Sequence, residues 1–483
     1  MRFFPAILFL GRLLAAFAAS MLAPAIVALI YDEPGVSFIF LATAAVTLFF
    51  GMGMVLAAQG AAGEVRRRSD LLAFVAAWPV AAAFAAVPLF LLGATPSPVD
   101  AYFEAVSALT TSGASVIGDL DAVSRGVVFW RAWMQWLGGL WTIVMAISIL
   151  PTLGIGAMDA FRSAMPHGEY VGLGTRARQL AATMAGIYGG LTAICAIALW
   201  AAGMPPFDAI GYAMSTLSTG GFVTDTAGLG AFDSPLVEGI LIVFMLLGAV
   251  NFTLFWALLR GRWKALARDP EVPYLIGLAL VGTAVITALL FRASGLDAID
   301  ALRRGLFTTV SALTTTGFVQ PMSVPWPAVL TILVLFLMFV GGSTASTAGG
   351  VKLMRARLAL GQGRRELARL SHPHGVVAIL YGGAPVSERT IQSLATYFIL
   401  FTTALAALAA TLALLGVEPE DALAMAAVSL TNSGSGFDLV TGTAARFALL
   451  PETAKWVLSA GMLLGRLELV AALVVFLPTF WRR

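Results

Sequence analysis

Long apolar runs recur from one end of this 483-residue chain to the other, and they decide its fold class. A hydrocarbon core of about 30 Å is crossed by roughly 20 helical residues, and ten runs reach that length. Charged residues make up only 11 % of the sequence, whereas soluble domains carry about 25 %. We therefore expect an all-α integral membrane protein. Its ten transmembrane helices are predicted at 6–30, 37–59, 71–93, 127–150, 180–202, 236–259, 273–291, 327–353, 391–415 and 454–477.

The first run, Pro5–Tyr31, could be mistaken for a signal peptide. It is longer than the apolar region of about 7–15 residues in such peptides, and a second run follows at once, so we expect a retained helix. Cys195 is the only cysteine, which excludes an internal disulfide. Three histidines and one cysteine leave little material for a zinc or haem site, and we expect no organic cofactor in this chain.

Basic residues gather in alternate loops, which predicts the orientation of the chain. Clusters occur at 66–68, 260–268 and 352–369, with Arg162 and the C-terminal arginines in the same pattern. With the N-terminus inside, all of them face the cytoplasm, whereas Arg131 and Lys455 fall near the outer side. Four short apolar stretches, near 100–112, 208–220, 303–316 and 421–433, then enter from outside. About 11 helical residues reach only about 16 Å, so each stretch must turn back half-way.

A sequence repeat follows these short stretches. Each copy has a leucine, then three small or hydroxyl-bearing residues, then a glycine. Asp100, Asp208 and Asp421 lie nine residues before their leucine, and we expect each to cap its half-helix. The third copy has Arg304 there and Asp300 one turn earlier, so this helix is expected to begin a turn sooner. The copies are Ser107–Gly113, Ser215–Gly221, Ser311–Gly317 and Val428–Gly434.

The repeat favours a cation pore. A half-helix that runs inward points the partial negative charge of its C-terminus at the membrane centre, and carbonyl rings can replace the hydration shell of K⁺. No copy has Asp or Glu in the turn, which argues against a divalent-cation filter. A single such cluster would be read as an ordinary helix contact, but four in one register favour a pore. We expect an N-terminal helix pair at 1–65 and four pseudo-symmetric M1–P–M2 repeats with re-entrant pore loops at 66–165, 166–268, 269–375 and 376–483.

The chain also resembles the TrkH-type membrane subunits of the Trk/Ktr/HKT superfamily of K⁺ transporters, over nearly its whole length. The resemblance rests on Trp130–Gly139, Ile149–Gly156, Ala202–Ile210, Gly341–Lys352 and Leu464–Glu468.

This resemblance implies that K⁺ is bound by carbonyl groups at the four turns. In plant HKT relatives, Ser in place of the first glycine favours Na⁺, and all four glycines are present here, which supports K⁺. Ser435 departs from the family, which has Pro at this position. The implied filter residues are Thr111, Ser112, Gly113, Thr219, Gly220, Gly221, Thr315, Thr316, Gly317, Asn432, Ser433 and Gly434.

The segment 341–350 interrupts the eighth apolar run with four glycines and four hydroxyl residues. Each glycine inside a helix costs about 1 kcal/mol relative to Ala, so a straight helix is not expected. One alternative is a face for close helix packing. The other, which the resemblance implies, is a movable loop beneath the filter. The gating residues are then Gly341, Gly342, Ser343, Thr344, Ser346, Thr347, Gly349 and Gly350.

Arg466 lies near the middle of the last run, where a charge costs at least about 2.5–3.5 kcal/mol. It either binds carbonyls at the end of a half-helix or, as the resemblance implies, limits ion flow together with the loop. Glu468 is two positions away and is a poor local partner for it. For Gln135 and Asn251, the other deep polar residues, hydrogen bonds between helices are expected rather than contact with an ion.

The resemblance implies K⁺ uptake across the bacterial inner membrane by a homodimer with one pore per subunit. It also implies a cytoplasmic, nucleotide-binding RCK partner of the TrkA type, and no nucleic acid. K⁺/H⁺ symport and less selective K⁺/Na⁺ conduction remain alternatives, although no carboxylate relay is evident. An inverted-repeat carrier would need repeats of opposite topology. An enzyme is not expected, because His167, His372 and His374 lie in cytoplasmic loops.

Overall fold

The computed structural model describes residues 4–59, 67–148, 175–320, 327–372, 375, 377–437 and 446–481. In these ranges the protein is helical, apart from a small antiparallel hairpin of β1 (Leu380–Tyr381) and β2 (Ala384–Pro385). Several sequence features lie outside the described residues: Arg66, Arg162, the motif 149–156, His167, His374 and the two C-terminal arginines.

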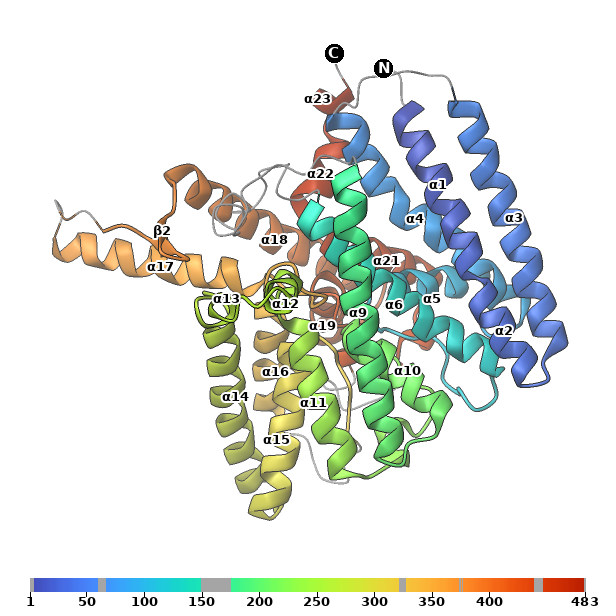
Figure 1. Ribbon diagram of the computed structural model, residues 1–483. Coiled ribbons are helices and arrows are strands. Elements are labelled where there is room, and N and C mark those ends of the chain that lie inside the picture. The colour runs from blue at the N-terminus through green and yellow to red at the C-terminus, as the bar shows by residue number, and fades with distance from the viewer. Residues whose placement is uncertain are drawn as a thin grey trace.

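Six segments of the described chain are long and apolar enough to cross a membrane. They correspond to six of the ten predicted helices. Both marked chain ends lie at the upper end of the bundle in Figure 1. The six segments are Phe4–Ile30, made of α1 (Phe4–Ser20) and α2 (Leu22–Ile30); α3 (Pro34–Ala58); Leu71–Leu91 of α4 (Arg67–Leu91); Ala181–Ala201 of α9 (Thr175–Ala201); α14 (Val272–Ala293); and α18 (Glu388–Leu414).

Two further predicted helices are broken, so the expectation of continuous helices over 236–259 and 454–477 is wrong. α11 (Pro235–Ala249) and α12 (Phe252–Leu259) meet at 94°, and α21 (Glu452–Arg466) and α22 (Leu469–Phe476) meet at 113°. At the first break the Asn251 side chain caps α12 by accepting a hydrogen bond from Thr253 N at 3.0 Å. At the second, Glu468 has a φ of +59°, outside the helical region.

The two other predicted helices differ from each other. α6 (Arg125–Ser148) is continuous over 24 residues, whereas α16 (Ala328–Val340) ends after 13, at Gly341. The prediction that the segment 341–350 breaks the helix is thus confirmed. The remaining helices are α13 (Lys264–Ala267), α17 (Leu353–Ser371), which extends away from the bundle in Figure 1, α23 (Pro478–Trp481), and the 3₁₀ turns η1 (Gly228–Ala231), η2 (Gly434–Gly436) and η3 (Arg446–Leu449).

Four half-length helices end at the four leucines of the repeat. They are α5 (Pro98–Leu109), α10 (Pro206–Leu217), α15 (Ala298–Leu313) and α19 (Pro419–Leu430). Three have 12 residues and α15 has 16, so the early start expected for the third copy is confirmed.

The predicted capping role of the aspartates is wrong. Asp100, Asp208, Asp300 and Asp421 all occupy the third position of their helices, and the N-cap residues are Ser97, Pro205, Asp297 and Glu418. In three copies a proline fills the first helical position, which it suits because it lacks an N–H. A carboxylate in the first turn is still stabilised by the helix dipole. The third copy therefore keeps its aspartate at the same helical position as the others.

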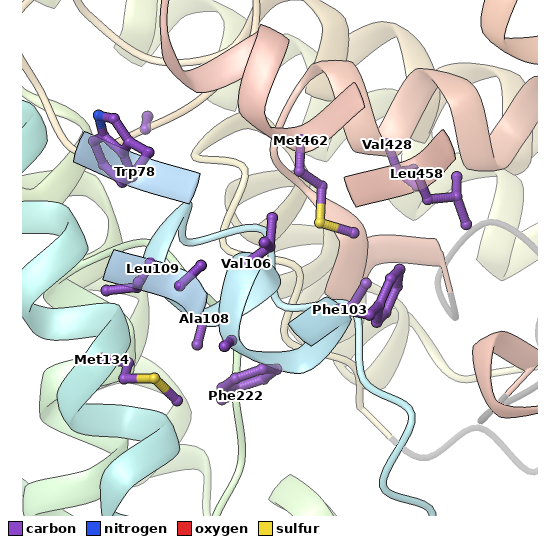
Figure 2. Close-up of a cluster of buried hydrophobic side chains, with 14 of the residues drawn as sticks. Trp78, Phe103, Val106, Ala108, Leu109, Met134, Phe222, Val428, Leu458 and Met462 are labelled. Carbon is purple, nitrogen blue, oxygen red and sulfur yellow. The ribbon is translucent and has the colours of Figure 1, made fainter. Parts of the chain in front are cut away.

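Most side chains of the first half-helix are buried. Figure 2 shows Phe103 and Val106 of α5 beside Met462 of α21, with Met134 of α6 and Phe222 nearby. All these side chains are buried. An ion pair between Asp100 and Lys455, with 2.5 Å between Oδ1 and Nζ and both side chains 5 % exposed, also joins α5 to α21. The apolar core and this pair together fix the half-helix within the bundle.

Candidate functional site

After each half-helix the backbone makes the same left-handed turn. The φ angles are +55° at Thr111, +52° at Thr219, +57° at Thr315 and +50° at Asn432. Non-glycine residues rarely adopt this conformation, and such local strain clusters at functional sites. The glycines two positions later are also left-handed in the first three copies, whereas Gly434 begins the 3₁₀ turn η2. The turns of the first three copies therefore share one backbone conformation, and the turn of the fourth copy differs.

The four turns, far apart in the sequence, meet at Ser435. Its N–H donates to Ser112 O at 3.1 Å, and its hydroxyl donates to Thr316 O at 2.7 Å and to Gly220 O at 3.5 Å. A Cβ atom on Gly113 would lie 2.0 Å from Gly220 O, so only glycine permits this approach. Ser112, Gly220 and Thr316, with the glycine that follows each of them, thus lie around Ser435.

Gln135 of α6 supports the second turn from behind. Its Nε2 donates to Gly220 O at 2.8 Å, and its Oε1 accepts hydrogen bonds from Ser215 Oγ at 2.8 Å and Phe222 N at 3.3 Å. The prediction that Gln135 forms hydrogen bonds between helices is confirmed. These bonds also fix the direction of a carbonyl group at the centre of the site.

A buried ion pair supports the chain that leaves the first turn, and the sequence analysis missed it. Arg131 Nε lies 2.7 Å from Glu104 Oε1, with 2 % and 0 % of the side chains exposed. Glu104 also accepts a hydrogen bond from Val116 N at 2.9 Å, and the guanidinium lies over the Phe222 ring. The sequence placed Arg131 only near the outer side. Two sequence features could have predicted this ion pair: Arg131 is a charged residue inside an apolar run, and Glu104 is an acidic residue in the neighbouring half-helix.

The loop 341–352 packs directly beneath the turns. Thr347 Oγ1 donates to Leu217 O at 2.9 Å, at the end of α10. Gly349 N donates to Thr315 Oγ1 at 2.7 Å, and Gly350 N donates to Thr431 O at 2.9 Å. One short segment therefore contacts the inner ends of the second, third and fourth copies, and nearly all of its residues are buried.

Glu271, just before α14, holds the same loop from the side. Its Oε2 accepts a hydrogen bond from Thr344 N at 2.7 Å, and its Oε1 accepts one from the hydroxyl of Tyr381 on the hairpin. Burial raises the pKa of the Glu271 carboxyl, although both hydrogen bonds oppose the shift. No sequence pattern predicts this contact, because Glu271 and Thr344 are 73 positions apart in the chain.

Arg466, the last residue of α21, binds the loop. Its Nη1 donates to Thr347 O at 2.9 Å, while Nε and Nη2 have no hydrogen-bond partner among the described residues. The other alternative is that Arg466 binds carbonyl groups at the end of a half-helix. Among the described residues it forms no hydrogen bond to such a carbonyl. Glu468 pairs instead with Arg355, at 2.5 Å.

The space between this loop, Arg466 and α6 is small. A cavity of about 30 Å³ is lined by Thr344, Gly349, Asn432 and Arg466, among others. That volume accommodates about one or two water molecules. A cavity of this size is too small for a hydrated cation.

Membrane-spanning helices that surround four half-helices and a point lined by carbonyl groups define a multi-pass membrane transport protein. The family model of TrkH, described as "Cation transport protein", matches residues 36–272 and 274–483. The chain belongs to this family, whose members are transporters of the inner membrane and not enzymes.

Characterised relatives match the chain over its full length. It is 38 % identical over 481 residues to the Trk system potassium uptake protein TrkH of Salmonella typhimurium, covering 98 % of each chain. The Vibrio parahaemolyticus TrkH is 39 % identical, with 100 % of both chains covered. The Escherichia coli TrkG is 33 % identical, covering 98 % of this chain and 97 % of the relative.

The fold agrees with a solved structure. The crystal structure of the potassium transporter TrkH from Vibrio parahaemolyticus matches with a TM-score of 0.92 and 37 % identity, covering 100 % of each chain.

Proposed function

We propose that this protein takes up K⁺ across the bacterial inner membrane through one central pore. The pore would be built from four pseudo-symmetric repeats with re-entrant loops, at 66–165, 166–268, 269–375 and 376–483, after an N-terminal helix pair at 1–65. The relatives are potassium uptake proteins, which supports K⁺ as the transported substrate. Neutral carbonyl groups at the turns, with no carboxylate among the repeated residues, support a monovalent cation.

The observation that carries this proposal is the convergence of Ser112, Gly220 and Thr316 carbonyl oxygens on Ser435. Four half-helices direct their C-termini at this point, and their dipoles add partial negative charge. A cation that has shed its water would be stabilised there without full negative charges nearby. The twelve residues at Thr111–Gly113, Thr219–Gly221, Thr315–Gly317 and Asn432–Gly434 form the selectivity filter in this proposal.

The loop and Arg466 form the gate. The eight residues Gly341, Gly342, Ser343, Thr344, Ser346, Thr347, Gly349 and Gly350 would move away from the inner ends of the half-helices when the pore opens. The bond from Arg466 to Thr347 favours the closed position. The positive charge also opposes a cation that enters the small cavity beside it.

The protein would act as a homodimer with a cytoplasmic, nucleotide-binding partner of the RCK type. The relatives are named as parts of a Trk system, which supports further components. The sequence of this chain contains no glycine-rich phosphate loop, so nucleotide control would come from that partner.

Ion flux in proteoliposomes tests the function. In proteoliposomes, the purified protein with its partner should carry K⁺. When it is expressed in a strain that lacks K⁺ uptake, the protein should restore growth. Reversal potentials measured in graded K⁺, Na⁺ and pH separate a K⁺ pore from the two alternatives, K⁺/H⁺ symport and less selective K⁺/Na⁺ conduction. An ion flux that does not depend on the K⁺ gradient would refute the proposal.

A further inference from the structure

Ser435 follows the fourth turn and contacts the turns of the other three copies. Its hydroxyl lies 2.7 Å from Thr316 O and 3.5 Å from Gly220 O. A Cβ atom on Gly113, Gly221 or Gly317 would lie between 2.2 and 2.7 Å from the same hydroxyl oxygen. From Thr431 to Phe437 it is the one residue that is not fully buried. The side chain therefore borders open space while its neighbours are packed.

The backbone of the fourth turn differs from that of the other three. The equivalent oxygen, Ser433 O, accepts a hydrogen bond from Gly436 N at 2.8 Å inside η2. Gly434 lacks the left-handed φ of the glycines in the other copies. The four carbonyls at this level are therefore not equivalent, and the Ser435 hydroxyl is a further oxygen beside those of Thr316 and Gly220.

A serine hydroxyl combines one donor with two acceptor lone pairs. In the structure the Ser435 hydroxyl donates its proton to Thr316 O. When a cation takes the place between the carbonyls, it satisfies Thr316 O directly, and the hydroxyl can turn its lone pair to the cation. No group needs to gain or lose a proton in this exchange.

We propose that Ser435 Oγ is a direct ligand of the transported cation, in place of the Ser433 carbonyl, and determines the ion preference of the pore. This inference rests on the proposed function. The alternative is that Ser435 only holds Thr316 O in position. If Ser435 Oγ is a ligand, changing its chemistry changes the preference of the pore among ions. If Ser435 only positions Thr316 O, its substitution affects the amount of protein, its stability or its maximal flux.

Two substitutions separate these roles in proteoliposome flux assays of the full-length protein with its partner. Ser435→Ala removes the oxygen and should raise the KM for K⁺ about tenfold, the effect of losing one neutral hydrogen-bond-strength contact. Ser435→Cys keeps the shape but offers sulfur, a soft ligand that prefers soft metal ions. It should raise the Tl⁺/K⁺ flux ratio roughly threefold or more, because Tl⁺ is the softer ion.

Ser20→Ala is the matched control, because its hydroxyl donates to Phe17 O at 2.6 Å at the end of α1, outside the four turns. Its KM and its Tl⁺/K⁺ ratio should stay within about twofold of the wild type. If both Ser435 variants keep the wild-type KM and ion ratio while the wild type carries K⁺, the inference is wrong and the proposed function stands. If the wild type carries no K⁺, the proposed function itself fails.

A second measurement needs no variant. Anomalous scattering from Tl⁺ bound to the wild-type protein should place the ion in direct contact with Ser435 Oγ. An ion held by carbonyls while the Ser435 hydroxyl still donates to Thr316 O would overturn the inference, even if the variants did not fold.

Discussion

Arg466 donates a hydrogen bond from Nη1 to the carbonyl oxygen of Thr347, 119 positions earlier in the chain, at 2.9 Å. The bond joins the break in the last helix to the loop beneath the turns. Because Thr347 also binds Leu217 O through its hydroxyl at 2.9 Å, the loop is held between Arg466 and the end of a half-helix. One residue, Thr347, thus fixes the loop from both sides.

Removal of the hydrogen bond between Arg466 and Thr347 O should open the proposed pore more often. Arg466→Ala eliminates both the hydrogen bond and the positive charge, so we expect K⁺ flux to rise several-fold, since a bond from a charged donor contributes roughly 1.5–3 kcal/mol. Arg466→Lys retains the charge without the guanidinium geometry, so its K⁺ flux should lie between those of the wild type and Arg466→Ala. Flux through equal amounts of purified protein gives the comparison. Unchanged or lower flux in a well-folded Ala variant would contradict a gating role.

Glu271 should make the stability of the protein depend on pH. Burial raises its pKa in the folded protein, so the folded state prefers the protonated form. The stabilisation is complete below the ordinary pKa of about 4.3 and is lost as pH rises through the folded value. Glu271→Gln cannot ionise, so its Tm should fall less than that of the wild type over this rise in pH. Parallel Tm curves for the two proteins would exclude this role for Glu271.

Tyr381→Phe tests the same link from the hairpin. The hydroxyl of Tyr381 donates to the buried Glu271 carboxylate, and its loss leaves an acceptor oxygen without that partner, at a cost of about 1–3 kcal/mol. We expect a lower Tm and higher basal flux, because Glu271 holds the loop through Thr344. The effects of Tyr381→Phe and Glu271→Gln should not add, because both act on one contact. Fully additive effects would show that the two residues act separately.

Helix α6 should not tolerate a side chain at Gly138. A Cβ atom there would lie 1.8 Å from Leu109 O, at the end of α5. Gly138→Ala should therefore destabilise the protein by about 1–3 kcal/mol or more and lower its yield, because the backbone of a half-helix would have to shift. Gly186→Ala on α9 is the control, since its Cβ would meet no atom within 4 Å. Equal thermal stability of both variants would argue against the tight contact.

The ion pair of Asp100 and Lys455 should behave as a unit. Asp100→Asn leaves a buried ammonium group with no opposite charge, and we expect a loss of about 3–5 kcal/mol. The double variant Asp100→Asn with Lys455→Met removes both charges and should recover much of that loss. Thermal unfolding in detergent measures the three proteins. A double variant that is less stable than the Asp100→Asn variant would contradict this account.

The repeated features were predictable because they occur four times. The ends of the half-helices coincide with Leu109, Leu217, Leu313 and Leu430, since the aligned leucines fix a common register. The break after Val340 was also predictable, because glycines and hydroxyl residues concentrate there. The helix caps were not, because an aspartate suits both the N-cap and the first turn.

Features that depend on long-range contacts could not be predicted. Hydropathy does not register the bends at Asn251 and Glu468, because a single polar residue barely changes the mean of an apolar run. The contact of Glu271 with Thr344 joins residues 73 positions apart. Ser435 stood out in the sequence only as a departure from a pattern, and its place at the centre of the site required the fold.

Ion density at the meeting point of the turns tests the central claim most directly. A structure determined in Rb⁺, a K⁺ substitute, should show an anomalous peak bounded by the carbonyl oxygens of Ser112, Gly220 and Thr316, on the axis between Gly113, Gly221, Gly317 and Gly434. The peak should weaken when Rb⁺ is replaced by K⁺, which scatters less. Bound Rb⁺ elsewhere in the protein, with none on this axis, would contradict a cation pore at the four turns.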